Sequence, residues 1–218
     1  MATVADSQAT VWTASEVLAR FGDIPIARIL TSPRPGSATE EDVVELLDHH
    51  DRLCELIDGV LVEKTMGWKE SYYAMLIARL LGNYVDANQL GIVLGPDGLF
   101  RLTPGQIRLP DVAFISKVRY KGGDFPEGAF WDQGFDLAIE IISKGNTRRE
   151  MERKLADYFN AGVQAVWFVN PKAREVIVYS SPTSSTTFKE SETLDASPVL
   201  AGFSLSIADV FSRGPTTN

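Results

Sequence analysis

The hydrophobic and polar positions of the chain follow two periods, one typical of helices and one typical of strands. Apolar residues recur at helical spacing over residues 72–84, which predicts a long amphipathic helix. Shorter helices are expected over residues 12–21 and 39–47. The second has acids in its first turn, where they suit the positive end of the helix dipole.

A fourth helix is expected from Thr147 to about residue 161. Thr147 and Glu150 match a capping box, and Gly162 follows Ala161 where a helix end is expected. Its apolar stripe comprises Met151, Leu155, Tyr158 and Phe159. Tyr158 is expected in the core. Lys154 lies on the flank of this stripe, so its long stem can reach a neighbouring sheet.

Several short apolar runs bounded by turn residues predict strands. Residues 53–63 predict a hairpin with Asp58-Gly59 as its turn. Further strands are expected at residues 92–94, 99–102, 110–115, 137–142, 165–170 and 175–179. Loops are expected at 31–37, 117–134, which includes Gly122 and Gly123, and the Ser/Thr-rich 180–187, with a short closing element at 201–211.

These elements predict an α/β (α+β) fold with a mixed central sheet flanked by helices. We expect one domain over residues 39–212, an N-terminal extension over 1–38 that is mobile through Thr10, and a C-terminal tail over 213–218. The chain has 218 residues, of which 44% are hydrophobic and 23% charged, as in an ordinary soluble globular protein.

The single cysteine, Cys54, excludes an internal disulfide and gives no support for a zinc site. It is expected in the core, and its solitary thiol fits a reducing compartment. No apolar run approaches the roughly 20 residues that span a bilayer, and the N-terminus lacks a secretory signal. We therefore expect a cytoplasmic protein without a membrane segment.

Two acids in apolar surroundings are the candidate chemistry. Asp111 opens one apolar run, and Glu140 lies inside another, on the strand face that Ala138 and Ile142 share. A buried carboxylate without a partner costs several kcal/mol or more, so such residues usually pair, protonate or hold a metal. Together with Lys154, they are the groups that metal-assisted phosphodiester hydrolysis requires.

Each of these residues also has a purely structural interpretation. Asp111 could cap local backbone amides, and Glu140 could form a salt bridge with Arg148 or Lys154. Lys154 alone could be a solvated helix charge. The segment Asp48-His49-His50-Asp51 is interpreted as a surface helix end, because adjacent histidines diverge on a helix and no further histidine completes a metal shell.

The order and context of six segments resemble the PD-(D/E)XK, or restriction-endonuclease-like, superfamily, and more narrowly its Uma-two-type branch of bacterial restriction endonucleases. The matching segments span about residues 41–211 and are Cys54-Glu55-Leu56-Ile57-Asp58-Gly59, Arg108-Leu109-Pro110-Asp111-Val112-Ala113-Phe114, Glu140-Ile141-Ile142-Ser143, Lys154-Leu155-Ala156-Asp157-Tyr158, Ala161-Gly162-Val163-Gln164-Ala165-Val166-Trp167 and Gly202-Phe203-Ser204-Leu205.

The resemblance implies that Asp111 and Glu140 bind Mg²⁺, with Mn²⁺ as an alternative, and that a lysine assists the attacking water. Two residues after Glu140 stands Ile142, so the strand lysine of the superfamily is missing. The resemblance to the Uma-two-type branch implies that the lysine comes from the helix that follows the strand. This makes Lys154 the candidate and Lys144 the substitute, while Glu55 could complete the metal shell.

The resemblance therefore implies a Mg²⁺-dependent DNA endonuclease that acts as a homodimer. Arg148, Arg149 and Arg153 could contact phosphates, although a solvated helix face explains them equally well. The net charge of -8 weighs against a nucleic-acid coating protein but not against a nuclease with acids at its metal site. The alternative is a non-catalytic module that binds a protein or small ligand through its acidic pocket. Hydrolysis of RNA would leave the site unchanged.

Overall fold

The computed structural model describes residues 11–120 and 127–212, and its centre is a mixed six-stranded sheet with the strand order β10-β9-β8-β7-β6-β3. Strands β7 and β8 run parallel, and the other neighbours in this sheet are antiparallel. The crossover between β7 and β8 is helix α5, which is the connection that a parallel pair requires. This arrangement confirms the predicted mixed sheet flanked by helices.

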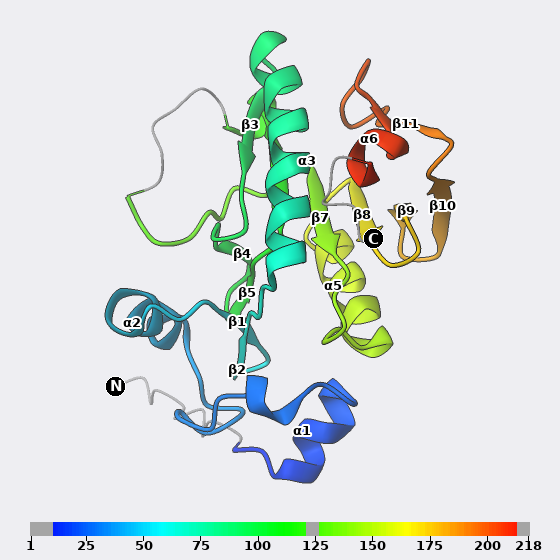
Figure 1. The fold of residues 1–218 in the computed structure, drawn as a ribbon. Coiled ribbons are helices and arrows are strands. Elements are labelled where there is room, and N and C mark those ends of the chain that lie inside the picture. The colour runs from blue at the N-terminus through cyan, green and yellow to red at the C-terminus, as the bar shows by residue number, and fades with distance from the viewer. Residues whose placement is uncertain (1–10, 121–126, 213–218) are drawn as a thin grey trace.

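Figure 1 shows the elements in chain order along the ribbon. The helices are α1 (Ala14–Phe21), the 3-10 turn η1 (Ile26–Arg28), α2 (Glu40–His50), α3 (Trp68–Ala87), α4 (Lys117–Tyr120), α5 (Arg148–Asn160) and α6 (Ile207–Phe211). The strands are β1 (Cys54–Ile57), β2 (Val60–Glu63), β3 (Gly91–Leu94), β4 (Phe100–Thr103), β5 (Gln106–Arg108), β6 (Val112–Ser116), β7 (Leu137–Ile141), β8 (Ala165–Asn170), β9 (Glu175–Ser181), β10 (Ser184–Lys189), β11 (Thr193–Asp195) and β12 (Ser204–Ser206).

The central sheet separates two hydrophobic cores, because successive side chains of a strand point to opposite faces. In β7, Leu137, Ile139 and Ile141 pack in the core that includes residues of α3 and α6. Ala138 packs in the other core, which is formed with Met151, Leu155 and Tyr158 of α5. Glu140 lies on the same strand face as Ala138 and therefore points toward α5, as the alternation predicts.

A second sheet of four strands, in the order β2-β1-β5-β4, brings the first hairpin to the candidate site. Strands β1 and β2 pair with Ile57 opposite Val60, so Asp58 and Gly59 form a two-residue turn. Both turn residues have positive φ, 50° and 73°, which suits the type I′ geometry that an Asp-Gly pair favours. The predicted hairpin is confirmed.

The N-terminal segment packs against the outer side of this hairpin (Figure 1). Val17, Phe21, Ile24 and Ile29 share a hydrophobic cluster with residues of β1 and β2. Arg28 then donates two hydrogen bonds to Glu150 of α5, at 2.8 and 3.1 Å, and both side chains are buried. This ion pair ties the N-terminal segment to the helix that carries Lys154.

Three of the predicted elements differ in the structure, and the strands β5 and β11 were not predicted. Helix α3 begins at Trp68, one turn earlier than the apolar spacing predicts. The predicted loop over residues 180–187 is wrong, because β10 pairs with β9 through Thr186 opposite Val178 and Thr187 opposite Ile177. Its exposed side chains are polar, so an edge strand resembled a loop in the sequence. The predicted loop over 117–134 begins with the short helix α4.

Some predictions fall on residues 1–10, 121–126 and 213–218, which lie outside the described residues. They include the mobile N-terminal segment, the loop glycines Gly122 and Gly123, and the C-terminal tail. Within the described ranges, no helix is both long and apolar enough to cross a membrane.

Candidate active site

Asp111 lies directly before β6 and is held by the neighbouring strand. Its backbone N–H donates to the carbonyl of Ile139 at 3.0 Å, and its Oδ2 accepts the backbone N–H of Ile141 at 2.7 Å. The carboxylate thus extends the β6 to β7 ladder beyond its last backbone pair. Because β7 also carries Glu140, this local pairing places the two buried acids at the same end of two adjacent strands.

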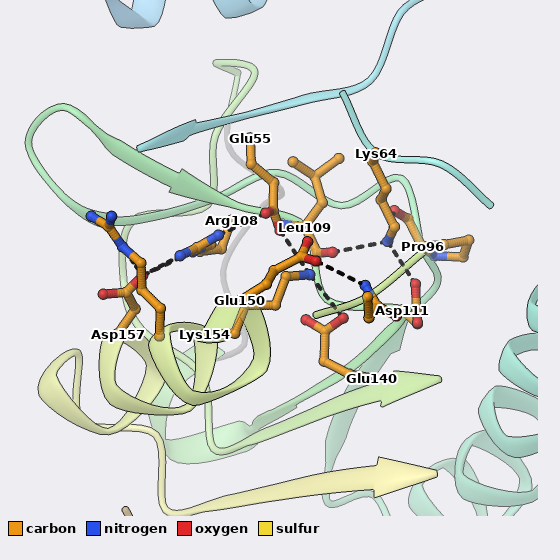
Figure 2. A network of polar contacts seen from close by, with 12 residues as sticks. Glu55, Lys64, Pro96, Arg108, Leu109, Asp111, Glu140, Glu150, Lys154 and Asp157 are labelled. Carbon is orange, nitrogen blue, oxygen red and sulfur yellow. Dashed lines mark hydrogen bonds and ion pairs between the residues drawn. The ribbon is translucent and has the colours of Figure 1, made fainter. Parts of the chain in front are cut away.

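Glu140 receives two donors from α5. Lys154 Nζ lies 2.9 Å from its Oε2, and the Tyr158 hydroxyl donates to its Oε1 at 2.5 Å. Lys154 and Tyr158 are four residues apart on α5, so both project from the same helix face. The structure therefore brings the predicted Lys154 to the predicted Glu140 and buries both (Figure 2). Tyr158 is in the core, as expected, but it is also a polar partner in the site.

Glu55 of β1 joins the network from the second sheet. Its Oε1 lies 3.1 Å from Lys154 Nζ, and its Oε2 lies 2.7 Å from Arg108 Nη1. Arg108 in turn donates to Asp157 of α5, at 3.0 Å through Nε and through Nη2 as well. Glu55 therefore holds the lysine and the arginine, and its carboxylate does not line the small pocket between Asp111 and Glu140.

The pKa directions follow from burial and from this sharing of charge. Burial raises the pKa of Glu140, and Asp111 and Glu55 add to that effect, while Lys154 opposes it. Burial also acts to raise the pKa of Glu55, but Lys154, Arg108 and Lys64 outweigh it and lower the pKa to about 2. The pKa of Lys154 is raised although burial acts to lower it, because Glu140 and Glu55 favour the ammonium form.

Lys64, which the sequence analysis missed, is the second lysine of the site. It follows β2, and its Nζ lies 2.9 Å from Asp111 Oδ1 and donates to the carbonyls of Leu109 at 2.8 Å and Pro96 at 3.1 Å. These three contacts use the full donor capacity of an ammonium group. Only its position directly after the predicted hairpin could have pointed to it.

A small pocket separates the two lysines. It has a volume of about 20 Å³, enough for roughly one water molecule. It is lined by Arg28, Lys64, Thr65, Glu70, Asp111, Glu140, Ile141, Ser143, Asn146 and Lys154. Glu70, in the first turn of α3, is a further acid that the sequence analysis did not select. Asp111, Glu140 and Lys154 thus line one pocket. Glu55 does not line it but contacts the Lys154 amine.

The donor set of this pocket fits a hard divalent cation. Mg²⁺ prefers carboxylate oxygens and keeps several waters, so Asp111 and Glu140 supply a sufficient protein contribution. Four carboxylates, Glu55, Asp111, Glu140 and Asp157, contact Lys64, Arg108 and Lys154, and Asp157 also lies 4.0 Å from Arg153. Among the residues that the structure describes, however, no group of three or more His, Cys, Asp or Glu side chains has metal-binding geometry.

The three candidate phosphate-binding arginines occupy different surroundings on α5. Arg148 is 92% exposed and pairs with Glu152 of the same helix at 2.6 Å. Arg153 is bound to Asp58 at 2.5 Å and lies over the Phe21 ring. Arg149 is exposed and packs beside Gly22. None of the three lines the pocket between Asp111 and Glu140.

Two other sequence interpretations are confirmed. His49 and His50 are exposed at the end of α2, where His49 lies 3.6 Å from Glu45. Cys54 is a buried core residue, and burial raises the pKa of its thiol to about 11. Neither feature belongs to the acidic pocket.

Comparison with solved structures supports the fold. The chain is similar to the crystal structure of "a putative nuclease belonging to DUF820" from Anabaena variabilis, with a TM-score of 0.68 and 19% sequence identity. The match covers 80% of this chain and 97% of that chain. No curated protein matches the chain.

The family assignment rests on the sequence match. Residues 40–208 match the family model described as "Uma2: Putative restriction endonuclease". This range includes both strands of the acidic pocket, the helix that carries Lys154 and the hairpin that carries Glu55. The predicted resemblance is confirmed, and the chain belongs to the Uma2 family.

Proposed function

We propose that the protein is a Mg²⁺-dependent DNA endonuclease whose site is formed by Asp111, Glu140 and Lys154. The observation that carries this proposal is the meeting of these three buried side chains, from the start of β6, from β7 and from α5, around one pocket. Two carboxylates and a cation at one point are the groups required for hydrolysis of a phosphodiester by an activated water. The family membership and the nuclease-like fold support the same reaction class.

Asp111 and Glu140 are the proposed metal ligands, with Mn²⁺ as an alternative to Mg²⁺. When bound, the ion would stabilise the charge that develops on the phosphate and would lower the pKa of a coordinated water. Asp111 is already oriented by the Ile141 N–H, and Glu140 is oriented by the Tyr158 hydroxyl. Cation binding requires the Lys64 and Lys154 ammonium groups to yield oxygens that they now contact.

Lys154 acts in this proposal as a fixed positive charge. Its raised pKa keeps the amine protonated near neutral pH, so it is not a general base in this state. An ammonium beside the reacting phosphate can orient water and neutralise developing negative charge. Glu55 holds this ammonium 3.1 Å from its Oε1, and Arg108 holds Glu55 in turn. We therefore favour a positioning role for Glu55 over direct metal binding.

The proposal extends to the assembly and location of the enzyme. Cleavage of both strands of a duplex needs two active sites or two sequential events, so we propose a homodimer by analogy with enzymes of this fold. The single cysteine is free and buried, which fits the proposed action in the cytoplasm.

Nicking of supercoiled plasmid DNA tests the reaction. Wild-type protein is expected to nick the plasmid with Mg²⁺ and not with EDTA. Asp111→Asn and Glu140→Gln are expected to lose at least about 100-fold of this activity, because each change removes a charged metal ligand. Glu152→Gln is the matched control, since Glu152 is an exposed acid on α5. Equal activity in all four proteins would refute the proposal.

A non-catalytic binding module is the second candidate, and one observation favours it. Each carboxylate oxygen of Asp111 and Glu140 already has a donor from this chain. A site in which every carboxylate oxygen has a donor from the same chain needs no metal. This candidate predicts that Mg²⁺ leaves the thermal unfolding midpoint unchanged, whereas a metal that binds only the folded state must raise it.

A further inference from the structure

Arg28 is a buried arginine that lies outside the residues matched by the family model. It belongs to η1, whereas the match covers residues 40–208. Its side chain nevertheless lines the acidic pocket, and it is the one arginine that does so among the residues that the structure describes. The N-terminal segment therefore supplies a wall of the candidate active site, although the family match does not reach it.

The guanidinium of Arg28 joins three parts of the chain. Its Nε donates to the carbonyl of Glu63 at 3.0 Å, at the end of β2. Its Nη1 donates to the carbonyl of Gly145 at 3.5 Å, between β7 and α5. Both terminal nitrogens donate to the carboxylate of Glu150, at 2.8 and 3.1 Å, in the first turn of α5. A guanidinium can make all these contacts at once, because its five N–H donors have a fixed fork geometry.

Two of these contacts lie beside the lysines of the site. Glu63 directly precedes Lys64 in the chain, and Glu150 lies one helical turn before Lys154 on α5 (Figure 2). The amines of the two lysines contact the two proposed metal ligands, each at 2.9 Å. Arg28 therefore connects the segment that places one ammonium group to the helix that places the other.

Glu150 also connects Arg28 to the start of α5. Its Oε2 accepts the side-chain amide of Asn146 at 3.3 Å and the backbone N–H of Thr147 at 3.4 Å. Its own backbone N–H donates to the hydroxyl of Thr147, the N-cap of the helix, at 3.1 Å. One carboxylate thus holds both the guanidinium and the helix cap, so a displacement of Arg28 changes the position of the first turn of α5.

We propose that Arg28 is a positioning residue of the active site, which fixes the ammonium groups of Lys64 and Lys154 relative to the two carboxylates that they contact. This inference rests on the proposed function and makes the N-terminal segment part of the catalytic unit. The pocket holds roughly one water molecule, so it leaves little room for displacement. A misplacement of about 1 Å that originates far from the reacting atoms can lower a rate by about 100-fold.

Steady-state nicking of supercoiled plasmid by Arg28→Lys tests this role. Lysine keeps the charge, but its single nitrogen cannot form the forked pair with Glu150. We expect kcat to fall by about tenfold or more, with KM for DNA within about twofold of wild type. Glu150→Gln keeps the side-chain shape and the capping box, and the same split is expected. Arg174→Gln is the control and should stay within about twofold of wild type, because Arg174 pairs with Glu190 at the surface.

The ammonium signal of Lys154 in a proton–nitrogen NMR spectrum of metal-free protein is a second readout, which does not depend on catalysis. Burial slows hydrogen exchange with water, so the signal is expected in wild type near neutral pH. Lys154→Arg removes the signal and thereby identifies it. We expect the signal to shift or broaden in Arg28→Lys and in Glu150→Gln, and to remain unchanged in Arg174→Gln.

Four results would overturn the positioning role. They are an unchanged kcat in both Arg28→Lys and Glu150→Gln, a raised KM with unchanged kcat, a Lys154 signal that neither variant alters, or a loss of activity that only matches the loss of folded protein by circular dichroism. The second would make Arg28 a direct DNA contact, and the last would make it an anchor of the fold alone. Absence of nicking by wild type, with a Lys154 signal that responds to Arg28→Lys, contradicts the proposed function alone.

Discussion

The amine of Lys154 lies 2.9 Å from Oε2 of Glu140, although the two residues belong to different elements and are separated by 14 positions in the chain. Both side chains are buried, so this contact forms where water does not screen it. Two structural facts produce it, the alternation that turns Glu140 toward α5 and the capped start of α5 at Thr147. Ile142 occupies the strand position where the resemblance predicts a lysine. Lys154, from helix α5, contacts the carboxylate of Glu140 instead.

Removal of Lys154 is expected to leave two buried acids without their shared cation. Lys154→Gln should lower the free energy of unfolding by about 3–5 kcal/mol, which is the usual cost of breaking a buried ion pair from one side. Urea unfolding at pH 7 measures the change. Lys172→Gln, at an exposed lysine in a turn, is the control and should stay within about 0.5 kcal/mol of wild type. A similar small loss for both variants would show that Lys154 is not holding the network.

Tyr158→Phe is expected to destabilise the fold through Glu140. The change deletes the hydroxyl that donates at 2.5 Å and leaves a buried carboxylate oxygen without that donor, at a cost of about 1–3 kcal/mol. Tyr84→Phe is the matched control, because its hydroxyl donates to the Ala201 carbonyl at 2.8 Å in an exposed place. Urea unfolding should find the larger loss at Tyr158. A larger loss at Tyr84 would contradict the role of the Tyr158 hydroxyl.

The stability that Glu55 contributes is expected to vanish in acid. Its folded pKa is about 2, below an unfolded value of about 4.3, so the folded state favours the ionised form. This contribution is present above the unfolded pKa and is lost as pH falls toward the folded pKa. It should amount to about 3 kcal/mol at pH 7.

Comparison of wild type with Glu55→Gln by urea unfolding at pH 7 and pH 3 measures this dependence. The destabilisation caused by the substitution should be larger at pH 7 and should shrink at pH 3. An equal destabilisation at the two pH values would mean that the charge of Glu55 is not stabilised by Lys154 and Arg108.

Much of the site could be predicted because it depends on local patterns. The alternation in β7 indicates the face of Glu140, and the capping pair Thr147 and Glu150 fixes the phase of the helix that carries Lys154. Lys64 could not be predicted in this way. Its role depends on the meeting of the hairpin with the start of β6, where Asp111 and the Leu109 carbonyl lie within its reach.

The second sheet explains the other omissions. Arg108 ends the short strand β5, which the sequence analysis did not predict. Its pairing with Glu55 depends on the register of β1 with β5. Strand β10 was missed for the opposite reason. Its exposed serine and threonine residues have the composition of a loop, but their pairing with β9 supplies the backbone hydrogen bonds of an edge strand.

The central claim is that Asp111 and Glu140 share one divalent cation, and calorimetric titration of metal-free protein with Mg²⁺ tests it most directly. The account predicts saturable binding to wild type and to Glu152→Gln, and no binding to Asp111→Asn or Glu140→Gln. Because the pKa of Glu140 is raised, protons should compete with the metal, and affinity should fall as the pH is lowered. Binding that is absent from wild type, or that persists in both site variants, would contradict the account.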